Sequence, residues 1–253
     1  MARKTWAYIG SGEVKMREVG AEAPFVVIGN CSVLQFSAEV DSKELQNFMR
    51  PGGGTYAKVD RIGSVGVNIT VHDLDGKNLA MASNGLASTK AGDTGETESL
   101  AAYGGGTTPF AFPPKKINSV KDEATGMITY DEGPEDDYIM TPSGIYIPDG
   151  SSIVDPVGGA ANIAVDYDYD DLQIVQAVAS SGKEFEFLFE GLNEVESDAA
   201  VIVRAYRVKF SPAQNIDFIG DDFAGLELAG TALPDTSIVS SALSQYWKAT
   251  LVV

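Results

Sequence analysis

The feature that most constrains this chain of 253 residues is an alternation of apolar and polar side chains that recurs along much of its length. Such alternation is typical of a strand that buries one face. When several alternating segments are separated by turns, they indicate antiparallel β-structure. The clearest segments are 33–40, with Leu34, Phe36, Ala38 and Val40 on one face; 65–72, with Val65, Val67, Ile69 and Val71; 184–190, with Phe185, Phe187 and Phe189; and 202–210, with Ile202, Tyr206, Val208 and Phe210.

One segment has helical spacing instead. Asp73 can cap it, Leu79, Ala82 and Leu86 recur at helical intervals, and Asn84-Gly85 supplies residues that tolerate positive φ near its end. We therefore expect a mainly β fold: an antiparallel β-sandwich or barrel with one short flanking α-helix and long loops. Shorter strands are expected at 6–9, 25–29, 126–130, 138–147, 172–179, 225–229 and 246–252.

The chain is expected to form a single β-domain over residues 1–253, interrupted by two long loops. Residues 41–58 contain Arg50-Pro-Gly-Gly-Gly-Thr and are expected to form a long hairpin loop. Residues 88–120 are rich in Gly, Thr and Pro and are expected to be an extended excursion, because the strand pattern resumes unchanged after them. Long loops in compact domains are usually functional, and in an assembling protein they would reach a neighbour.

Charge is distributed unevenly along the chain, whose formal net charge is −18. Residues 1–92 hold 10 basic and 9 acidic residues, whereas residues 93–253 hold 8 and 27. This balance argues against affinity for nucleic acid or an anionic membrane. Cys31 is the only cysteine, so no intrachain disulfide is possible. We see neither a signal peptide nor an apolar run long enough to cross a membrane, and expect synthesis in the cytoplasm.

The sequence offers little chemistry. His72 is the only histidine, so a hydrolase that uses His72 with Asp73 or a nearby serine stays an alternative without a supporting motif. Asp166, Asp168 and Asp170 match the first carboxylates of an EF-hand loop, but Asp171 and Ala177 stand where glycine and glutamate are required. We favour a solvated acidic strand face there over a loose cation site. We expect no catalytic residues, no metal and no cofactor.

In the order of its segments, the chain resembles the tail tube (major tail) proteins of bacteriophages with long non-contractile tails. The resemblance covers about half of the chain and depends on the order and style of the segments, because none is a short motif with its own chemistry. The segments are 38–48 followed by Arg50-Pro-Gly-Gly-Gly-Thr-Tyr and Val59-Asp-Arg-Ile; 67–82, a strand that leads into a helix; and 185–193, 201–213, 225–230 and 246–252.

This resemblance implies a structural virion protein that forms stacked hexameric rings, in which sheets of neighbouring subunits pair edge to edge around a lumen. Genomic DNA would pass through without specific binding, and the other partners would be the tape measure protein, the tail terminator and the distal tail or baseplate proteins. The protein would be located in the virion tail, after synthesis in the host bacterial cytoplasm, with no membrane partner. The hairpin is implied to make the inter-ring contact, with residues 1–11 and the C-terminus as secondary candidates. The inter-ring residues are Phe48, Arg50, Pro51, Gly52, Gly53, Gly54, Tyr56 and Lys58.

An acidic lumen would repel DNA phosphates, which suggests lumen-facing roles for acidic residues of the second part of the chain. The residues expected there are Asp166, Asp168, Asp170, Glu184 and Glu186. Two alternatives stay open: another β-rich virion or surface protein, such as a capsid decoration or adhesin-like module, and the tube protein of a contractile-tail or type VI system.

Overall fold

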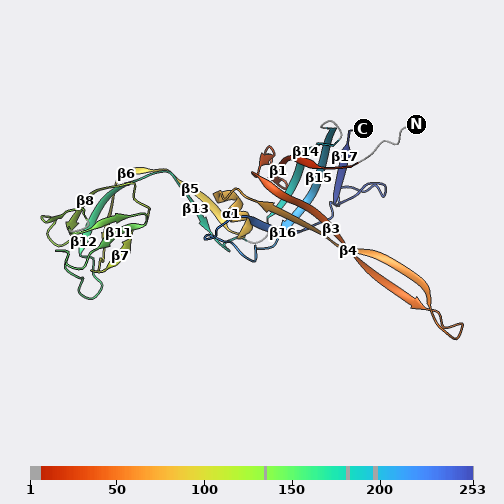
Figure 1. The fold of residues 1–253 in the computed structure, drawn as a ribbon, viewed down its shortest axis with the longest axis horizontal. Helices are drawn as coiled ribbons and strands as arrows, with labels where there is room; N and C mark the ends of the chain where they lie inside the picture. The colour runs from red at the N-terminus through yellow and green to blue at the C-terminus, as the bar shows by residue number, and fades with distance from the viewer. Residues whose placement is uncertain (1–6, 134–135, 181–182, 196–198, 253) are drawn as a thin grey trace. The chain divides into compact units, whose positions relative to one another are not determined.

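The computed structural model describes residues 7–133, 136–180, 183–195 and 199–252. Within these residues the protein is mainly β, with 17 strands in antiparallel sheets and a single short helix, which confirms the predicted fold class. The chain forms two compact units where we expected one domain. Unit 1 comprises Met1–Ala87 and Val175–Val253, and unit 2 comprises Ser88–Ile174 (Figure 1).

Unit 1 is built on one eight-stranded sheet in the order β2-β1-β14-β15-β16-β4-β3, and β17 pairs with β15 outside this path. β15 pairs with two strands along the same edge: its residues 201–205 pair with β17, and its residues 208–210 pair with β16. The strands are β1 (Gly10–Glu18), β2 (Val26–Val27), β3 (Cys31–Gln46), β4 (Thr55–Val71), β14 (Glu184–Asn193), β15 (Ala199–Phe210), β16 (Leu226–Ala232) and β17 (Trp247–Leu251).

The core of unit 1 is formed by the apolar residues of the alternating strands, as predicted for β4 and β14. Val67 and Ile69 of β4 pack with Phe187 of β14 in one buried cluster. In β15, a bulge opposite β14 between Phe185 and Phe187 changes which residues face the core. Ala205 before the bulge and Val208 after it are both buried, and Ile202 is exposed. The prediction that Ile202 shares a face with Val208 was wrong, because an extra residue in one strand reverses the alternation.

The helix α1 (Gly76–Ala82) begins at Asp75, whose side chain accepts a hydrogen bond from the Asn78 backbone N–H at 2.7 Å. The sequence predicts Asp73 as the N-cap, and this prediction is wrong, because the structure places Asp75 at that position. Positive φ at Asn84 follows the helix, as expected, but Leu86 belongs to the next strand. The buried Asn78 amide donates to the backbone oxygens of Ile28 at 2.7 Å and Asp73 at 2.9 Å, and so ties the helix to the segments that flank β2 and β4.

Unit 2 contains a three-stranded sheet, β10-β11-β7, and a four-stranded sheet, β6-β12-β8-β9. Its own buried cluster draws on both sheets, with Ile145 and Ile147 from one and Val165 and Tyr167 from the other. The strands are β6 (Asp93–Leu100), β7 (Gly106–Pro109), β8 (Lys116–Asp122), β9 (Thr129–Tyr130), β10 (Ile139–Thr141), β11 (Gly144–Ile147) and β12 (Ile163–Tyr169). A further pair, β5 (Leu86–Lys90) and β13 (Leu172–Gln176), forms a two-stranded sheet at the two points where the chain passes between the units.

Several predicted boundaries change. Residues 88–120 are not an excursion: they include β6, β7 and most of β8, which build unit 2. Within 41–58, only residues 47–54 lie outside strands. Of the predicted strand 6–9, residue 6 lies outside the described residues, and residues 7–9 precede β1.

The two units differ in charge. Unit 2 holds 4 basic and 16 acidic residues, a net charge of −12, and unit 1 holds 14 and 20, a net charge of −6. Most of the excess acidity therefore belongs to a unit with its own core.

Candidate functional site

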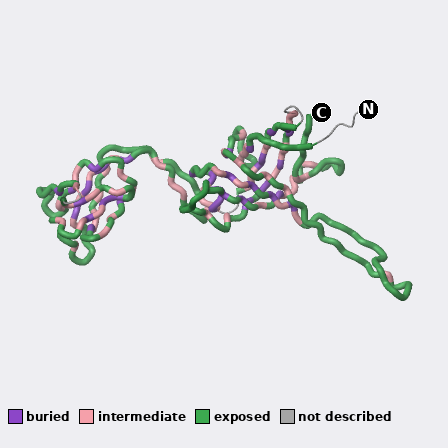
Figure 2. Tube along the Cα trace, viewed as in Figure 1, coloured by how far each residue is buried: buried purple, intermediate pink, exposed green. Residues whose placement is uncertain are grey.

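The most conspicuous feature of unit 1 is the long hairpin formed by β3 and β4. Close to the core, Phe36 is paired with Val67, which is buried. Beyond this point the two strands continue, and no other element in the described part of the chain covers them. Apart from the half-buried Asn47, every residue from 37 to 63 is exposed, and Figure 2 shows this part of the hairpin as an exposed ribbon. We call residues 39–63 the ribbon.

The tip of the ribbon is a glycine-rich turn. Gly52, Gly53 and Gly54 all have positive φ, which side-chain-bearing residues rarely adopt. The turn closes where the Asn47 N–H donates to the Gly54 carbonyl at 2.7 Å. This geometry explains why the sequence places three glycines in succession here.

The ribbon exposes apolar side chains that its own unit does not cover. Phe48 and Met49 at the tip are 86% and 73% exposed, and Tyr56 at the start of β4 is 60% exposed. An isolated two-stranded hairpin is marginally stable in water, and exposed strand edges invite pairing with other chains. The ribbon therefore leaves apolar side chains and strand edges exposed on the subunit. All eight residues predicted for inter-ring contact lie at its tip or in the first residues of β4.

A second exposed apolar segment was missed by the sequence analysis. In the loop 211–225 between β15 and β16, Phe218, Ile219 and Phe223 are 71%, 95% and 97% exposed. The sequence does contain a signal for this exposed segment: three large apolar residues lie among aspartates and glycines, in a stretch without a strand pattern.

Unit 1 also presents open strand edges. In the described part of the chain, β17 pairs only with β15. On the other side, β1 pairs with β2 only at Lys15 and Met16, so that its first residues, 10–13, have a strand partner on one side only. The strands β1, β14, β15 and β17 thus form a continuous four-stranded section with an open edge at either end.

One face of β1, β14 and β15 packs into the core, whereas β17 is exposed, and the other face of the section carries charged side chains. We call the latter the charged face. Its centre is Glu186, which is 7% exposed and forms ion pairs with Arg17, at 2.6 Å, and Arg204. By strand register and side-chain contacts, the face carries six basic and four acidic residues: Lys15, Arg17, Arg204, Arg207, Lys209, Lys248, Glu13, Glu184, Glu186 and Glu190.

The five acidic residues expected to face a lumen are divided between the units. Glu184 and Glu186 belong to unit 1, and each is paired with arginine. Asp166, Asp168 and Asp170 alternate with the buried Tyr167 and Tyr169 along and after β12, as the alternation predicted. The pKa of Asp168 is lowered because the Asn118 amide and the Gly95 N–H donate to its carboxylate. Among the described residues, no group of three His, Cys, Asp or Glu side chains could hold a metal ion.

His72 lies at the end of β4 and contacts a serine. Its Nε2 is 2.9 Å from Ser32 Oγ, and its Nδ1 is 3.2 Å from the Ala224 carbonyl oxygen. The Asp73 carboxylate instead accepts a hydrogen bond from the Asn30 N–H at 3.2 Å. Of the two partners that the hydrolase alternative offered to His72, Asp73 does not contact the ring, whereas a nearby serine, Ser32, does. Among the described residues, no carboxylate hydrogen-bonds to the ring. Burial, followed by the nearby Asp73 charge, raises the pKa of the Cys31 thiol to about 11, which disfavours a reactive thiolate.

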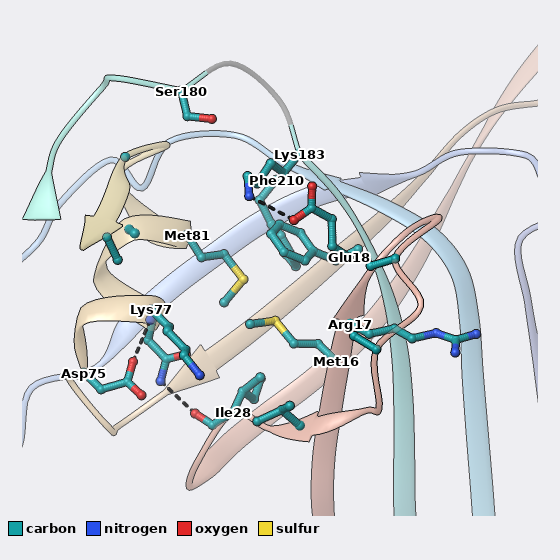
Figure 3. Close-up of a pocket in the computed structure, with 18 of the residues that line it drawn as sticks. Met16, Arg17, Glu18, Ile28, Asp75, Lys77, Met81, Ser180, Lys183 and Phe210 are labelled. Carbon is teal, nitrogen blue, oxygen red and sulfur yellow. Dashed lines mark hydrogen bonds and ion pairs between the residues drawn. The ribbon is translucent and has the colours of Figure 1, made fainter. Parts of the chain in front are cut away.

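Unit 1 contains an apolar pocket of about 480 Å³ beside α1. Met16 of β1 and Met81 of α1 point toward one another across it, and Ile28 and Phe210 complete the apolar wall (Figure 3). Three of the charged groups at its rim already have partners: Glu18 pairs with Lys183 at 2.9 Å, and Asp75 caps the helix. The pocket can accept an apolar side chain, but its described lining residues do not bring catalytic groups together.

No helix in the described part of the chain is both long and apolar enough to cross a membrane. No curated protein matches the sequence. Residues 7–250 match the family described as "Protein of unknown function UCP028589", so the chain belongs to this family.

Proposed function

We propose that this protein is the subunit of a bacteriophage tail tube, in which hexameric rings stack around a lumen that conducts genomic DNA. The observation that carries the proposal is the ribbon, a two-stranded extension with exposed apolar side chains at its tip. Burial of Phe48 and Met49 against the next ring accounts for a feature that costs stability and solubility in an isolated subunit.

The open edges of the four-stranded section provide a route to ring closure. Pairing of β17 of one subunit with residues 10–13 of the next subunit's β1 would continue the sheet around the ring. Closed symmetry removes the exposed edges that would otherwise promote aggregation. Because the opposite face packs into the core, the charged face would then line the lumen.

The remaining partners follow from this assignment. The tape measure protein would occupy the lumen during assembly, and the tail terminator and the distal tail or baseplate proteins would meet the two ends of the tube. The location would be the virion tail, after synthesis in the host cytoplasm. Since no residue needs to react with DNA, the protein would act as a conduit and not as an enzyme.

Negative-stain electron microscopy of concentrated, purified protein tests the proposal. We expect rings or hollow filaments with sixfold symmetry. A variant in which residues 47–54 are replaced by Asn-Gly, a favoured two-residue hairpin turn, should still form rings but should not stack. A wild-type protein that stays monomeric at all concentrations would contradict the proposal.

One observation favours a second candidate, a capsid decoration or adhesin-like protein. Unit 2 has its own core and most of the net negative charge, as expected for a displayed module. Microscopy separates the two candidates, because a displayed module does not need to form filaments. A tube from a contractile or type VI system would form similar filaments and differ by binding an outer sheath protein.

A further inference from the structure

The charged face contains three arginines whose Nε and NH2 groups contact glutamates of the same sheet. The Nε and NH2 groups of Arg17 both contact Glu186 Oε2 at 2.6 Å, and Arg204 contacts Glu186 Oε1 through the same two groups. One carboxylate therefore engages two guanidinium groups from neighbouring strands.

The same arrangement recurs along the face. Arg207 donates to Glu184 Oε2 from Nε at 2.9 Å and from NH2 at 2.7 Å. Lys15 contacts Glu190 and lies 3.3 Å from Glu13. These pairs leave few basic groups on the face without a carboxylate partner.

The donor geometry matters because a guanidinium group binds carboxylate and phosphate through the same planar set of N–H groups. A face with six basic residues would ordinarily attract a polyanion. Here the side chains of Arg17, Arg204 and Arg207 are only 32–40% exposed and are turned to glutamates.

We propose that Glu184, Glu186 and Glu190 keep the charged face from binding duplex DNA by occupying the basic groups that phosphates would otherwise contact. The face is thus a masked polyanion-binding surface and not an acidic repulsive wall. This inference deepens the proposed function, on which its biological purpose rests: DNA would slide past a lining in which four of the six basic side chains are already paired with carboxylates.

The test measures DNA binding by the full chain at subunit concentrations, with fluorescence anisotropy of a labelled 20-base-pair duplex. In the variant E184Q/E186Q/E190Q, the amides cannot neutralise the basic groups. We expect it to bind DNA at least tenfold more tightly than wild type. Its log K should fall with log salt with a slope of about −0.9 for each phosphate contacted, or about −3 for three contacts.

A matched control has the same change in net charge away from the face. D217N/D221N/D222N alters three exposed carboxylates in the loop 211–225 of unit 1 and should bind DNA no better than wild type. Because Glu186 is buried, E184Q/E190Q serves as a second variant with the central pairs intact, and should show a smaller gain. Circular dichroism and thermal unfolding establish that each variant is folded.

Two outcomes would overturn the inference. One is that the folded E184Q/E190Q and triple variants bind no more tightly than the control. The other is that wild type already binds DNA as tightly as the triple variant, so that nothing is masked. Neither outcome depends on filament formation, which microscopy of wild type tests separately.

Discussion

The ribbon tip yields the sharpest prediction for assembly. In F48S/M49S, two apolar side chains that are 86% and 73% exposed in the subunit become polar. Since these side chains contribute little to the subunit's own core, its free energy of unfolding should change by less than about 0.5 kcal/mol. In a stacked tube, however, each of them would be buried.

The expected size of the assembly defect follows from this difference. Full burial of a Phe or Met side chain contributes about 1.5–3 kcal/mol, so losing both should cost at least about 3 kcal/mol for each subunit contact. With a factor of ten for each 1.4 kcal/mol, the concentration required for stacking should rise roughly a hundredfold.

Sedimentation and light scattering over a concentration series would measure this change, with denaturant unfolding as the check on the subunit. The matched control is M127S/V157S, which removes two side chains of similar exposure, 88% and 90%, from unit 2. The reasoning is refuted if F48S/M49S stacks at the wild-type concentration, or if the control impairs stacking equally.

Three further predictions concern the fold. Ile145→Ala removes a fully buried side chain and should destabilise unit 2 by about 2–5 kcal/mol, giving an early unfolding transition that leaves unit 1 intact in hydrogen exchange; a single shared transition would contradict the separation of the cores. Asp75→Ala should lower the free energy of unfolding by about 1 kcal/mol, as measured by urea denaturation, because it removes the N-cap of α1. An unchanged urea midpoint would argue against that cap. Asn118→Ala should raise the pKa of Asp168 toward its ordinary value of 3.8, as measured by NMR titration. Because folding lowers this pKa, the wild-type carboxylate's stabilising effect is present above pH 3.8 and is lost as the pH falls below it, and the variant should lose less stability over that acidic range.

Much of unit 1 could be predicted from the sequence because its strands bury one face and leave the other exposed. Val67 and Ile69 in β4 and Phe187 in β14 are buried as the alternation indicates. The face of Ile202 could not be predicted, because the bulge in β15 depends on pairing with β14, which is a tertiary interaction.

Unit 2 could not be predicted from the sequence for a different reason. Its edge strand β6 has the sequence DTGETESL, in which Leu100 is the only large apolar residue. Such an edge strand gives little alternation, and glycine and proline nearby suggest a loop. The tip of the ribbon was placed correctly because consecutive glycines mark a turn between strand patterns, but the length of the paired strands around it was not predicted.

The pairing of Glu186 with Arg17 and Arg204 was likewise outside the reach of the sequence. The residues are separated by 169 and 18 positions, and only the strand order brings them together. Alternation showed that the glutamates lie opposite the phenylalanines, and it suggested a bare acidic face because the basic partners lie on other strands.

The pairing of β5 with β13 has a practical consequence. Where two strands pair, their backbones are about 4.8 Å apart, so the chain leaves unit 1 and returns to it at nearly the same place. An insertion whose ends meet so closely can be exchanged for another domain with adjacent termini, because the host backbone does not need to move. Residues 88–174 are therefore a natural position for grafting enzymes, epitopes or fluorescent reporters onto this scaffold.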